Sequence, residues 1–208
     1  MKIKPSFLPA NEMYEYRIII QPHEDLCEKI NSIKRSFAES YQLPVYRYAK
    51  PDITLVRFTQ YEMPEERIVH RLQNIATGDA SFKIELKDFG SSPTHSIFIN
   101  VATKANIVAL VKEIKSIQKL MKPDEEHKPH FITEPFISIA SKLLPWQYEK
   151  AWQEYSNANF TAMFMANEIV LLKRKQGDKK YKTIKRFQFQ PHLTSPKGRN
   201  KTEQLSFF

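Results

Sequence analysis

The sequence predicts an α+β protein built from two similar, largely antiparallel halves. Three observations support this: apolar residues alternate between two-residue and three-to-four-residue spacing, the segments follow one another in a repeating order, and the chain is long enough for two small lobes. That order is strand–helix–strand–helix–strand–strand, followed by helix–strand–helix and three more strands. With 208 residues the chain can form one substantial core or two lobes that share one.

Eight segments rich in β-branched and aromatic residues predict strands. Most are bounded by proline, glycine or polar residues, and segment 82–86 (FKIEL) alternates apolar and charged residues as a half-exposed strand does. The last two segments form a hairpin around the turn Gln176-Gly177-Asp178. The predicted strands are 14–21, 53–58, 82–86, 96–101, 136–140, 160–165, 169–174 and 181–189.

Four segments predict amphipathic helices. The first begins at His23 and places its apolar residues on one stripe to about Ser40, and the second opens at Pro64, in the first-turn position that helices prefer for proline. The third covers 107–121, and the fourth covers 145–155 with Trp146 and Trp152 as expected packing anchors.

Composition excludes several classes of function. The four glycines stand alone, so the chain has no glycine-rich phosphate loop or dinucleotide fingerprint, and we expect no cofactor. Cys27 is the only cysteine, which excludes an internal disulfide and a Cys-x-x-Cys metal site. We find no signal peptide and no membrane-spanning run, so a cytoplasmic protein is expected.

The chain is strongly basic. It has 32 lysines and arginines against 23 acids, a formal net charge of +9. This surplus fits a polyanionic partner such as nucleic acid or a phosphate ester, or else a basic protein whose charge only keeps it soluble.

Two short segments match each other. Segments 51–55 (PDITL) and 135–139 (PFISI) each hold proline, a variable residue, an aliphatic residue, a hydroxyl residue and another aliphatic residue. The variable positions are 136 − 52 = 84 residues apart. Alternate residues of a strand share a face, so Asp52 lies with Thr54 and Phe136 with Ser138. The two hydroxyls meet across a cleft if the halves pack about a pseudo-twofold axis; otherwise they are incidental residues of two core strands.

These motifs resemble those of the 2H phosphoesterase superfamily, which includes 2′-5′ RNA ligases and 2′,3′-cyclic phosphodiesterases. That family carries two His-x-Thr/Ser motifs at a similar spacing, and segments 16–22 (YRIIIQP), 169–174 (IVLLKR) and 181–187 (YKTIKRF) resemble its opening and closing parts. The resemblance covers roughly residues 14–190. It implies a single bilobal domain over 1–190, with two mainly antiparallel sheets around a central cleft and helices outside. Composition, rich in proline, serine, threonine, lysine and asparagine, predicts a polar and basic tail over 191–208.

The chain departs from the family at both histidines. Asp52 and Phe136 occupy the histidine positions of the two motifs, whereas Thr54 and Ser138 keep the hydroxyl positions and are the expected phosphate-binding residues. In the family mechanism one imidazole removes a proton from the attacking hydroxyl or water, and the other protonates the leaving oxygen. A carboxylate is a much weaker base than imidazole near neutral pH, and a phenyl ring transfers no proton.

We therefore expect a catalytically impaired protein that binds RNA or a nucleotide phosphate in the cleft. The alternative is an active phosphodiesterase or RNA ligase in which Asp52 and an unplaced proton donor carry the chemistry. His130 lies six residues before Phe136, about 20 Å away along an extended chain. His192 stands in a literal His-x-Thr sequence after the closing hairpin, where we expect a chance match. No histidine has partners at metal-ligand spacing, so no metal site is expected.

The end of the chain is the most basic part. Residues 173–201 hold eleven lysines and arginines and a single acid, Asp178. The hairpin residues Lys173, Arg174, Lys185 and Arg186 are candidates for binding a nucleic-acid backbone. An alternative is an edge hairpin that lysines protect from aggregation.

The last five residues, QLSFF, resemble the peptide by which bacterial replication and repair proteins dock on the sliding clamp. In that comparison Gln204, Leu205, Phe207 and Phe208 are the expected contact residues, presented on a polar tether. Phe207 stands where leucine is usual. The alternative is that these side chains pack on the protein's own domain.

Overall fold

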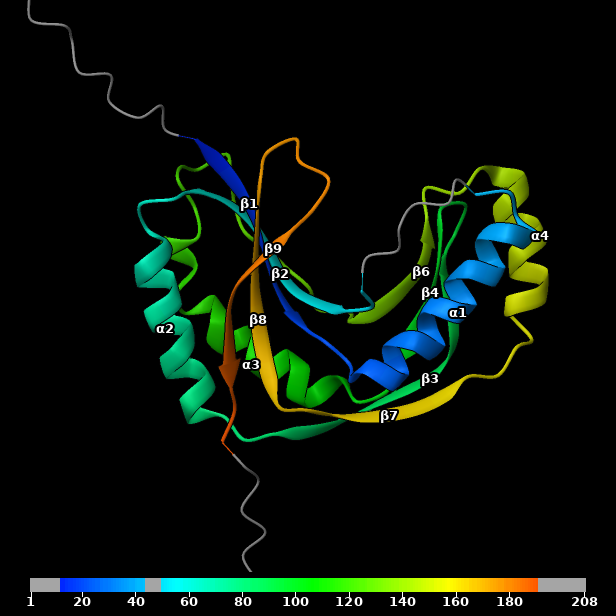
Figure 1. The fold of residues 1–208 in the computed structure, drawn as a ribbon, viewed down its shortest axis with the longest axis horizontal. Helices are drawn as coiled ribbons and strands as arrows, with labels where there is room; N and C mark the ends of the chain where they lie inside the picture. Colours follow the sequence, from blue (N-terminus) through cyan, green and yellow to red (C-terminus); the bar gives the residue numbers. More distant parts are fainter. Residues whose placement is uncertain (1–11, 44–49, 191–208) are drawn as a thin grey trace, which may run out of the picture.

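The computed structural model describes residues 12–43 and 50–190, and in this part of the chain nine strands form one sheet that carries four α-helices (Figure 1). All pairs between neighbouring strands are antiparallel. The strands are β1 (Met13–Ile20), β2 (Ile53–Tyr61), β3 (Phe82–Ser92), β4 (Ser96–Val101), β5 (His130–Phe131), β6 (Phe136–Ser141), β7 (Thr161–Ala166), β8 (Glu168–Lys175) and β9 (Lys182–Gln188). The helices are α1 (Glu24–Ser40), α2 (Glu65–Gly78), α3 (Lys104–Lys115) and α4 (Pro145–Tyr155), with a short 3-10 helix at Gln118–Leu120.

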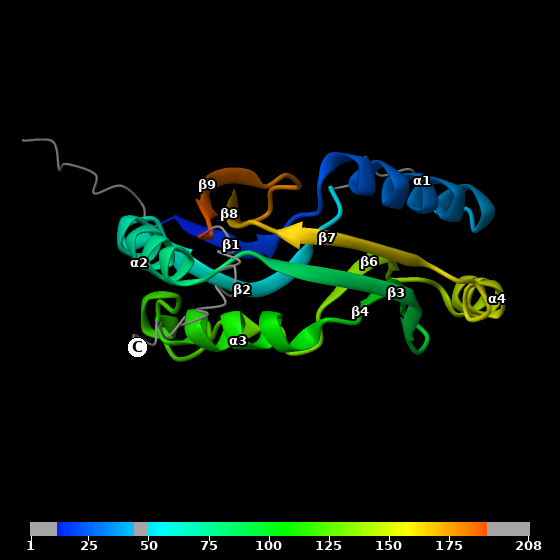
Figure 2. The same cartoon turned by 90° about the horizontal axis from the view of Figure 1, so that it is seen from below.

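The sheet divides into two lobes of four main strands each. Its order is β7-β3-β4-β6-β2-β1-β8-β9, and β5 pairs with β2 off this path. Helices α1 and α4 contact the lobe of β7, β3, β4 and β6, whereas α2 and α3 contact the lobe of β2, β1, β8 and β9. The two lobes lie at opposite ends of the molecule in Figure 2. Counted outward from the centre, the order β6-β4-β3-β7 repeats as β2-β1-β8-β9, which is the arrangement of a pseudo-twofold.

The predicted α+β bilobal class is confirmed, with two refinements. The two expected sheets are continuous, because β2 and β6 pair where Ile53 meets Ile137. The lobes are also not consecutive halves of the chain: β8 returns to pair with β1, and α1 packs on β6 of the other lobe. Long-range pairing of buried strands decides this exchange, and local patterning carries no information about it.

Most element boundaries lie close to those expected from the sequence. The third helix is shorter than predicted, since it ends at Lys115 and a 3-10 turn follows. Strand β5 was missed because two residues are too few for a pattern. Trp146 is a correction: its side chain is 47% exposed at the start of α4, whereas Trp152 packs against the core as expected. No helix in the described ranges combines the length and apolarity needed to cross a membrane.

The lobes meet over an apolar core. Ile53 and Ile137 are fully buried at the junction, and the large side chains of Tyr16, Phe37 and Phe187 are buried within the lobes. Fully burying an aliphatic side chain stabilises the folded state by about 1.5–3 kcal/mol. Because both isoleucines face the core, the residues before and after each of them face the opposite side of the sheet, toward the space between the lobes.

Gly90 allows close packing on the cleft side of β3. A Cβ atom at this position would lie 2.5 Å from Asn100 Oδ1 and 2.5 Å from Cε2 of Phe98, while a Cβ at Gly78 would meet nothing within 4 Å. The Phe98 ring cannot easily yield, because its centroid lies 4.6 Å from that of Phe136.

We therefore predict that Gly90→Ala lowers the free energy of unfolding by about 1–3 kcal/mol, the usual cost of overpacking. Gly78→Ala, at the end of α2, is the matched control and is expected to be neutral or to stabilise by up to about 1 kcal/mol. Urea denaturation of both variants measures the difference. Equal stability of the two variants would contradict the close packing of Phe98 over Gly90.

Candidate functional site

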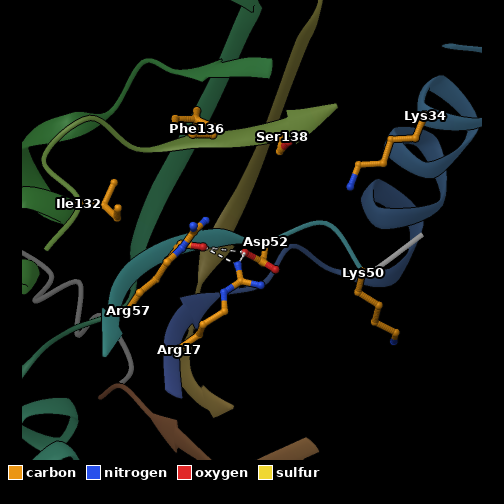
Figure 3. A pocket seen from close by; sticks show the side chains of 9 residues that line it. Arg17, Lys34, Lys50, Asp52, Arg57, Ile132, Phe136 and Ser138 are labelled. Carbon is orange, nitrogen blue, oxygen red and sulfur yellow. Dashed lines mark hydrogen bonds and ion pairs between the residues drawn. The ribbon is translucent and has the colours of Figure 1, made fainter. Parts of the chain in front are cut away.

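A cavity of about 240 Å³ opens between the lobes, on the cleft side of the β2–β6 junction. Its walls come from β1, α1, the start of β2, the segment after β5, and β6 (Figure 3). The lining residues are Arg17, Lys34, Lys50, Asp52, Thr54, Arg57, Ile132, Phe136 and Ser138.

The junction brings the four motif residues together. Ile53 and Ile137 pair across β2 and β6, and each is the central residue of its motif. Asp52 and Thr54 flank one isoleucine, and Phe136 and Ser138 flank the other; all four line the cavity. The two hydroxyls therefore share one hollow, as the spacing of the motifs predicts.

Arg17, Asp52 and Thr54 form a compact hydrogen-bonded group. Arg17 reaches from β1, and its Nη2 lies 2.5 Å from Asp52 Oδ1 and also donates to Thr54 Oγ1. The Thr54 hydroxyl in turn donates to Asp52 Oδ1 over 3.1 Å. The side chains of Arg17 and Asp52 are only 17% and 12% exposed, so water weakens this pair little. Asp52 Oδ1 is thus occupied by two donors, and the Thr54 hydroxyl by an acceptor and a donor.

The cavity is strongly cationic. Arg17, Lys34, Lys50 and Arg57 face a single acid, Asp52, which leaves a net charge of 4 − 1 = +3 among the lining residues. Lys50 also pairs with Glu24 at an exposed position.

Lys34 reaches from α1 toward the space near Ser138 (Figure 3). Burial lowers the pKa of the Lys34 ammonium, because the charged form loses its hydration, and the nearby Asp52 carboxylate opposes this only in part. A bound anion would restore favourable contacts to this ammonium.

Phe136 contributes an apolar surface on the other side of the cavity. The residue is 37% exposed, and its ring packs on Phe98, with a centroid distance of 4.6 Å and an angle of 31° between the rings. Ile132 lines the same side (Figure 3). The cavity therefore has a cationic half and an apolar half.

No imidazole lines this cavity in the part of the chain that the structure describes. His130 is exposed on β5, where it pairs with Arg57 of β2, and Ile132, two residues later, is the residue that reaches the cavity. His192 lies outside the described residues. Within the described ranges no group of three or more histidine, cysteine, aspartate or glutamate side chains is arranged to hold a metal ion.

The four predicted nucleic-acid-binding residues have different environments. Arg174 pairs with Glu15 and lies over the Tyr181 ring, and Arg186 pairs with Glu168; each lines a hollow next to the cavity. Lys185 is exposed on β9.

Lys173 is placed differently from the other three. Its side chain is buried, and its Nζ lies 2.6 Å from Glu62 and 2.7 Å from Glu65. Two carboxylates already neutralise this ammonium, so a contact with nucleic acid would require both ion pairs to break.

Sequence reasoning missed the cations of the cavity, Arg17, Lys34, Lys50 and Arg57. For two of them a signal exists: Arg17 and Arg57 are single arginines inside otherwise apolar strands (YRIII and ITLVRF), where a charge needs a reason. Lys34 has no such signal, because lysine is ordinary on the polar side of a helix. The predicted clamp-binding residues Gln204, Leu205, Phe207 and Phe208 lie outside the described residues, and their docking stays a prediction.

Comparisons with known proteins agree with this geometry. A sequence model of the family described as the 2′-5′ RNA ligase superfamily matches residues 22–178. A crystal structure of E. coli LigT complexed with 3′-AMP superposes with a TM-score of 0.60 at 13% identity, over 86% of this chain and 98% of that one. The same share of this chain and 99% of the other match a crystal structure of a phosphoesterase (TM-score 0.61, 12% identity) and that of TT0787 of Thermus thermophilus (0.58, 11%). No curated protein sequence matches. At these identities the structural likenesses establish the fold.

The ion pair of Arg17 and Asp52 leads to a prediction about stability. Asp52→Asn leaves a mostly buried guanidinium without its carboxylate, so we expect the free energy of unfolding to fall by about 1–3 kcal/mol in phosphate-free buffer. Added inorganic phosphate should restore part of this loss, because it supplies a counter-charge to Arg17. Urea denaturation with and without phosphate measures both effects.

Glu149→Gln, an exposed substitution on α4, is the matched control and should change neither value. If Asp52→Asn is as stable as the parent protein in phosphate-free buffer, the pair does not hold Arg17 in place.

Proposed function

This chain belongs to the 2′-5′ RNA ligase superfamily, and from that membership we propose that its central cavity binds a phosphate group of RNA or of a nucleotide without cleaving it. The observation that carries the proposal is the composition of the cavity wall. It keeps the two motif hydroxyls and adds four cations, yet it presents no imidazole in the described part of the chain.

Binding of an anion is supported by charge and by burial. The lining residues carry a net charge of +3. Of the four cations, Arg17, Lys34 and Arg57 lie closest to the recess between the lobes (Figure 3), whereas Lys50 is exposed and pairs with Glu24. Low-dielectric walls strengthen attraction to an anion. Arg17 Nε is buried and has no hydrogen-bond partner among the described residues. Arg57 and Lys34 reach the same space from β2 and α1. An anionic oxygen would find several donors here at once.

Impaired cleavage is supported by the hydrogen bonds that Asp52 already accepts. Its Oδ1 accepts hydrogen bonds from Arg17 and Thr54, so the carboxylate acts as a counter-ion to the guanidinium. Phe136, at the second histidine position, carries no exchangeable proton. Phosphodiester transfer through this motif pair needs one group to remove a proton and another to supply one. Phe136 can do neither, and Asp52 is engaged through Oδ1 as the counter-ion of Arg17.

The structural neighbours agree with a phosphate ligand. Crystal structures of E. coli LigT are described as complexes with 3′-AMP, with phosphate and with ATP. Those ligands belong to LigT. They support the proposal because this chain shares the fold, and Thr54 and Ser138 both line its central cavity.

A hydrolysis assay tests the catalytic part of the proposal. We predict no detectable turnover of a 2′,3′-cyclic nucleotide by the purified protein, and a gain of at least about 10²-fold over background in the double variant Asp52→His/Phe136→His, since a placed general acid or base typically contributes 10²–10⁴. Asp52→His/Phe136→Leu is the matched control, because it restores only one imidazole.

The opposite outcome is equally clear. Turnover by the unmodified protein that Asp52→Ala abolishes would establish the alternative, an active phosphodiesterase that uses Asp52.

A second experiment tests anion binding directly. Lys34→Met should weaken the binding of inorganic phosphate by about 10-fold or more, because a hydrogen bond to a charged group contributes about 1.5–3 kcal/mol. The same change should not destabilise the protein, since it removes an ammonium whose burial is unfavourable. Calorimetric titration and urea denaturation measure the two effects. Arg35→Met, exposed on the same helix, is the control and should leave phosphate affinity nearly unchanged.

The lowered pKa of Lys34 also sets a pH dependence. Between the pKa of Lys34 in the folded protein and its unfolded value of 10.5, the unfolded chain binds more protons at this position than the folded protein does. The free energy of unfolding therefore rises with pH across this window. Lys34→Met should remove that contribution.

In the titration with phosphate, unchanged affinity in Lys34→Met would contradict the assignment of this lysine to the anion site.

A further inference from the structure

We infer that Phe136, at the position of the second motif histidine, is a stacking surface for a nucleobase whose own phosphate lies in the cationic half of the cavity. This inference rests on the proposed function and specifies its ligand as a nucleotide, free or at the end of a strand, in preference to a bare phosphate or a sugar phosphate.

The Phe136 ring is exposed on one face and supported on the other. Phe136 is one of few large apolar side chains in the described part of the chain that stay more than a third exposed, and it is the one that lies in the cavity. Phe98 backs it at 4.6 Å, and Phe98 in turn lies against Gly90, where a side chain would displace it. Among the described residues no arginine or lysine lies over the Phe136 ring, whereas cations do lie over Tyr14, Tyr16, Phe131, Phe160, Tyr181 and Phe187. The ring is supported from behind by Phe98, and its exposed face is not covered by a stacked arginine or lysine of the described ranges.

The cavity has a cationic side and an apolar side. Figure 3 shows Phe136 and Ile132 on one side and Arg17, Asp52 and Arg57 on the other. A bare phosphate would occupy the cationic side and leave two apolar side chains in contact with water. A nucleotide has one part for each side: an anion for the cations and a flat aromatic base for the ring.

Space for a larger ligand is available next to the cavity. A second hollow of about 530 Å³ lies next to the cavity, and Arg17, Lys50 and Asp52 line both. This adjoining space offers room for a ligand larger than phosphate. Ser138 lies two residues after Phe136 on the same face of β6, where its hydroxyl can donate to the phosphate of a nucleotide whose base stacks on the ring.

Phenylalanine in place of histidine changes the chemistry available at this position. The position loses a group that transfers protons and gains a neutral aromatic face, which binds bases of any sequence because each base has a π-face. Such a site holds its ligand by the base and the phosphate together and has no means of hydrolysing it at this position.

The experiment compares two ligands that differ only in the base. We expect the full-length protein to bind AMP more tightly than ribose 5-phosphate in calorimetric titrations. Phe136→Leu, which keeps an apolar side chain but removes the aromatic ring, should weaken AMP binding by roughly 5- to 150-fold, the range for stacking of one base, and leave ribose 5-phosphate unchanged. Phe136→Tyr should restore AMP binding. Trp146→Leu, an exposed aromatic residue outside the cavity, is the control and should change neither affinity.

Two results would overturn the inference. Equal affinity of the unmodified protein for AMP and ribose 5-phosphate would show that the base is not recognised. Equal losses for both ligands in Phe136→Leu would show that the ring shapes the anion site instead. In both cases binding of ribose 5-phosphate would leave the proposed function standing. Failure of AMP, ribose 5-phosphate and inorganic phosphate to bind at all would instead refute the proposed function itself.

Discussion

The short contact between β2 and β6 is the constraint on which the rest of this protein depends. Two buried isoleucines, Ile53 and Ile137, pair there and join the two lobes into one sheet. Since side chains alternate along a strand, the residues flanking these isoleucines must face the space between the lobes. A core contact and the two walls of a cavity are thus produced by the same five-residue motif, used twice.

The ion pair of Arg17 and Asp52 is the central polar contact of this cavity. Both side chains are mostly buried, and the carboxylate pairs with the guanidinium and also accepts a hydrogen bond from the Thr54 hydroxyl. The same arrangement engages Asp52 Oδ1 with two donors, which is one ground for our proposal that the site binds without cleaving. Under the proposed assignment of Asp52 to the first histidine position, one aspartate changes both the charge of the site and the hydrogen bonding of the neighbouring hydroxyl.

The fold class and the positions of most helices and strands followed from local patterns of apolar residues. The motif pair pointed to the cavity, and the family match confirms the resemblance drawn from it. Sequence reasoning failed where spacing carries no signal. Lys34 looks like an ordinary surface lysine. Lys173 looks like part of a basic surface, although it is buried and pairs with Glu62 and Glu65. Burial and pairing between residues more than 100 positions apart are decided by strand order, which local patterns do not encode.

The sequence by itself determined which chemical groups stand at the motif positions: two hydroxyls, a carboxylate and a phenyl ring where imidazoles would be expected. The tertiary structure alone decided which other groups join them. Arg17 and Arg57 come from strands whose register places them beside Asp52, and Lys34 comes from a helix packed on the opposite lobe. The physical reason is that a site between two lobes collects side chains from segments far apart in the chain, and only the pairing of buried strands brings those segments together.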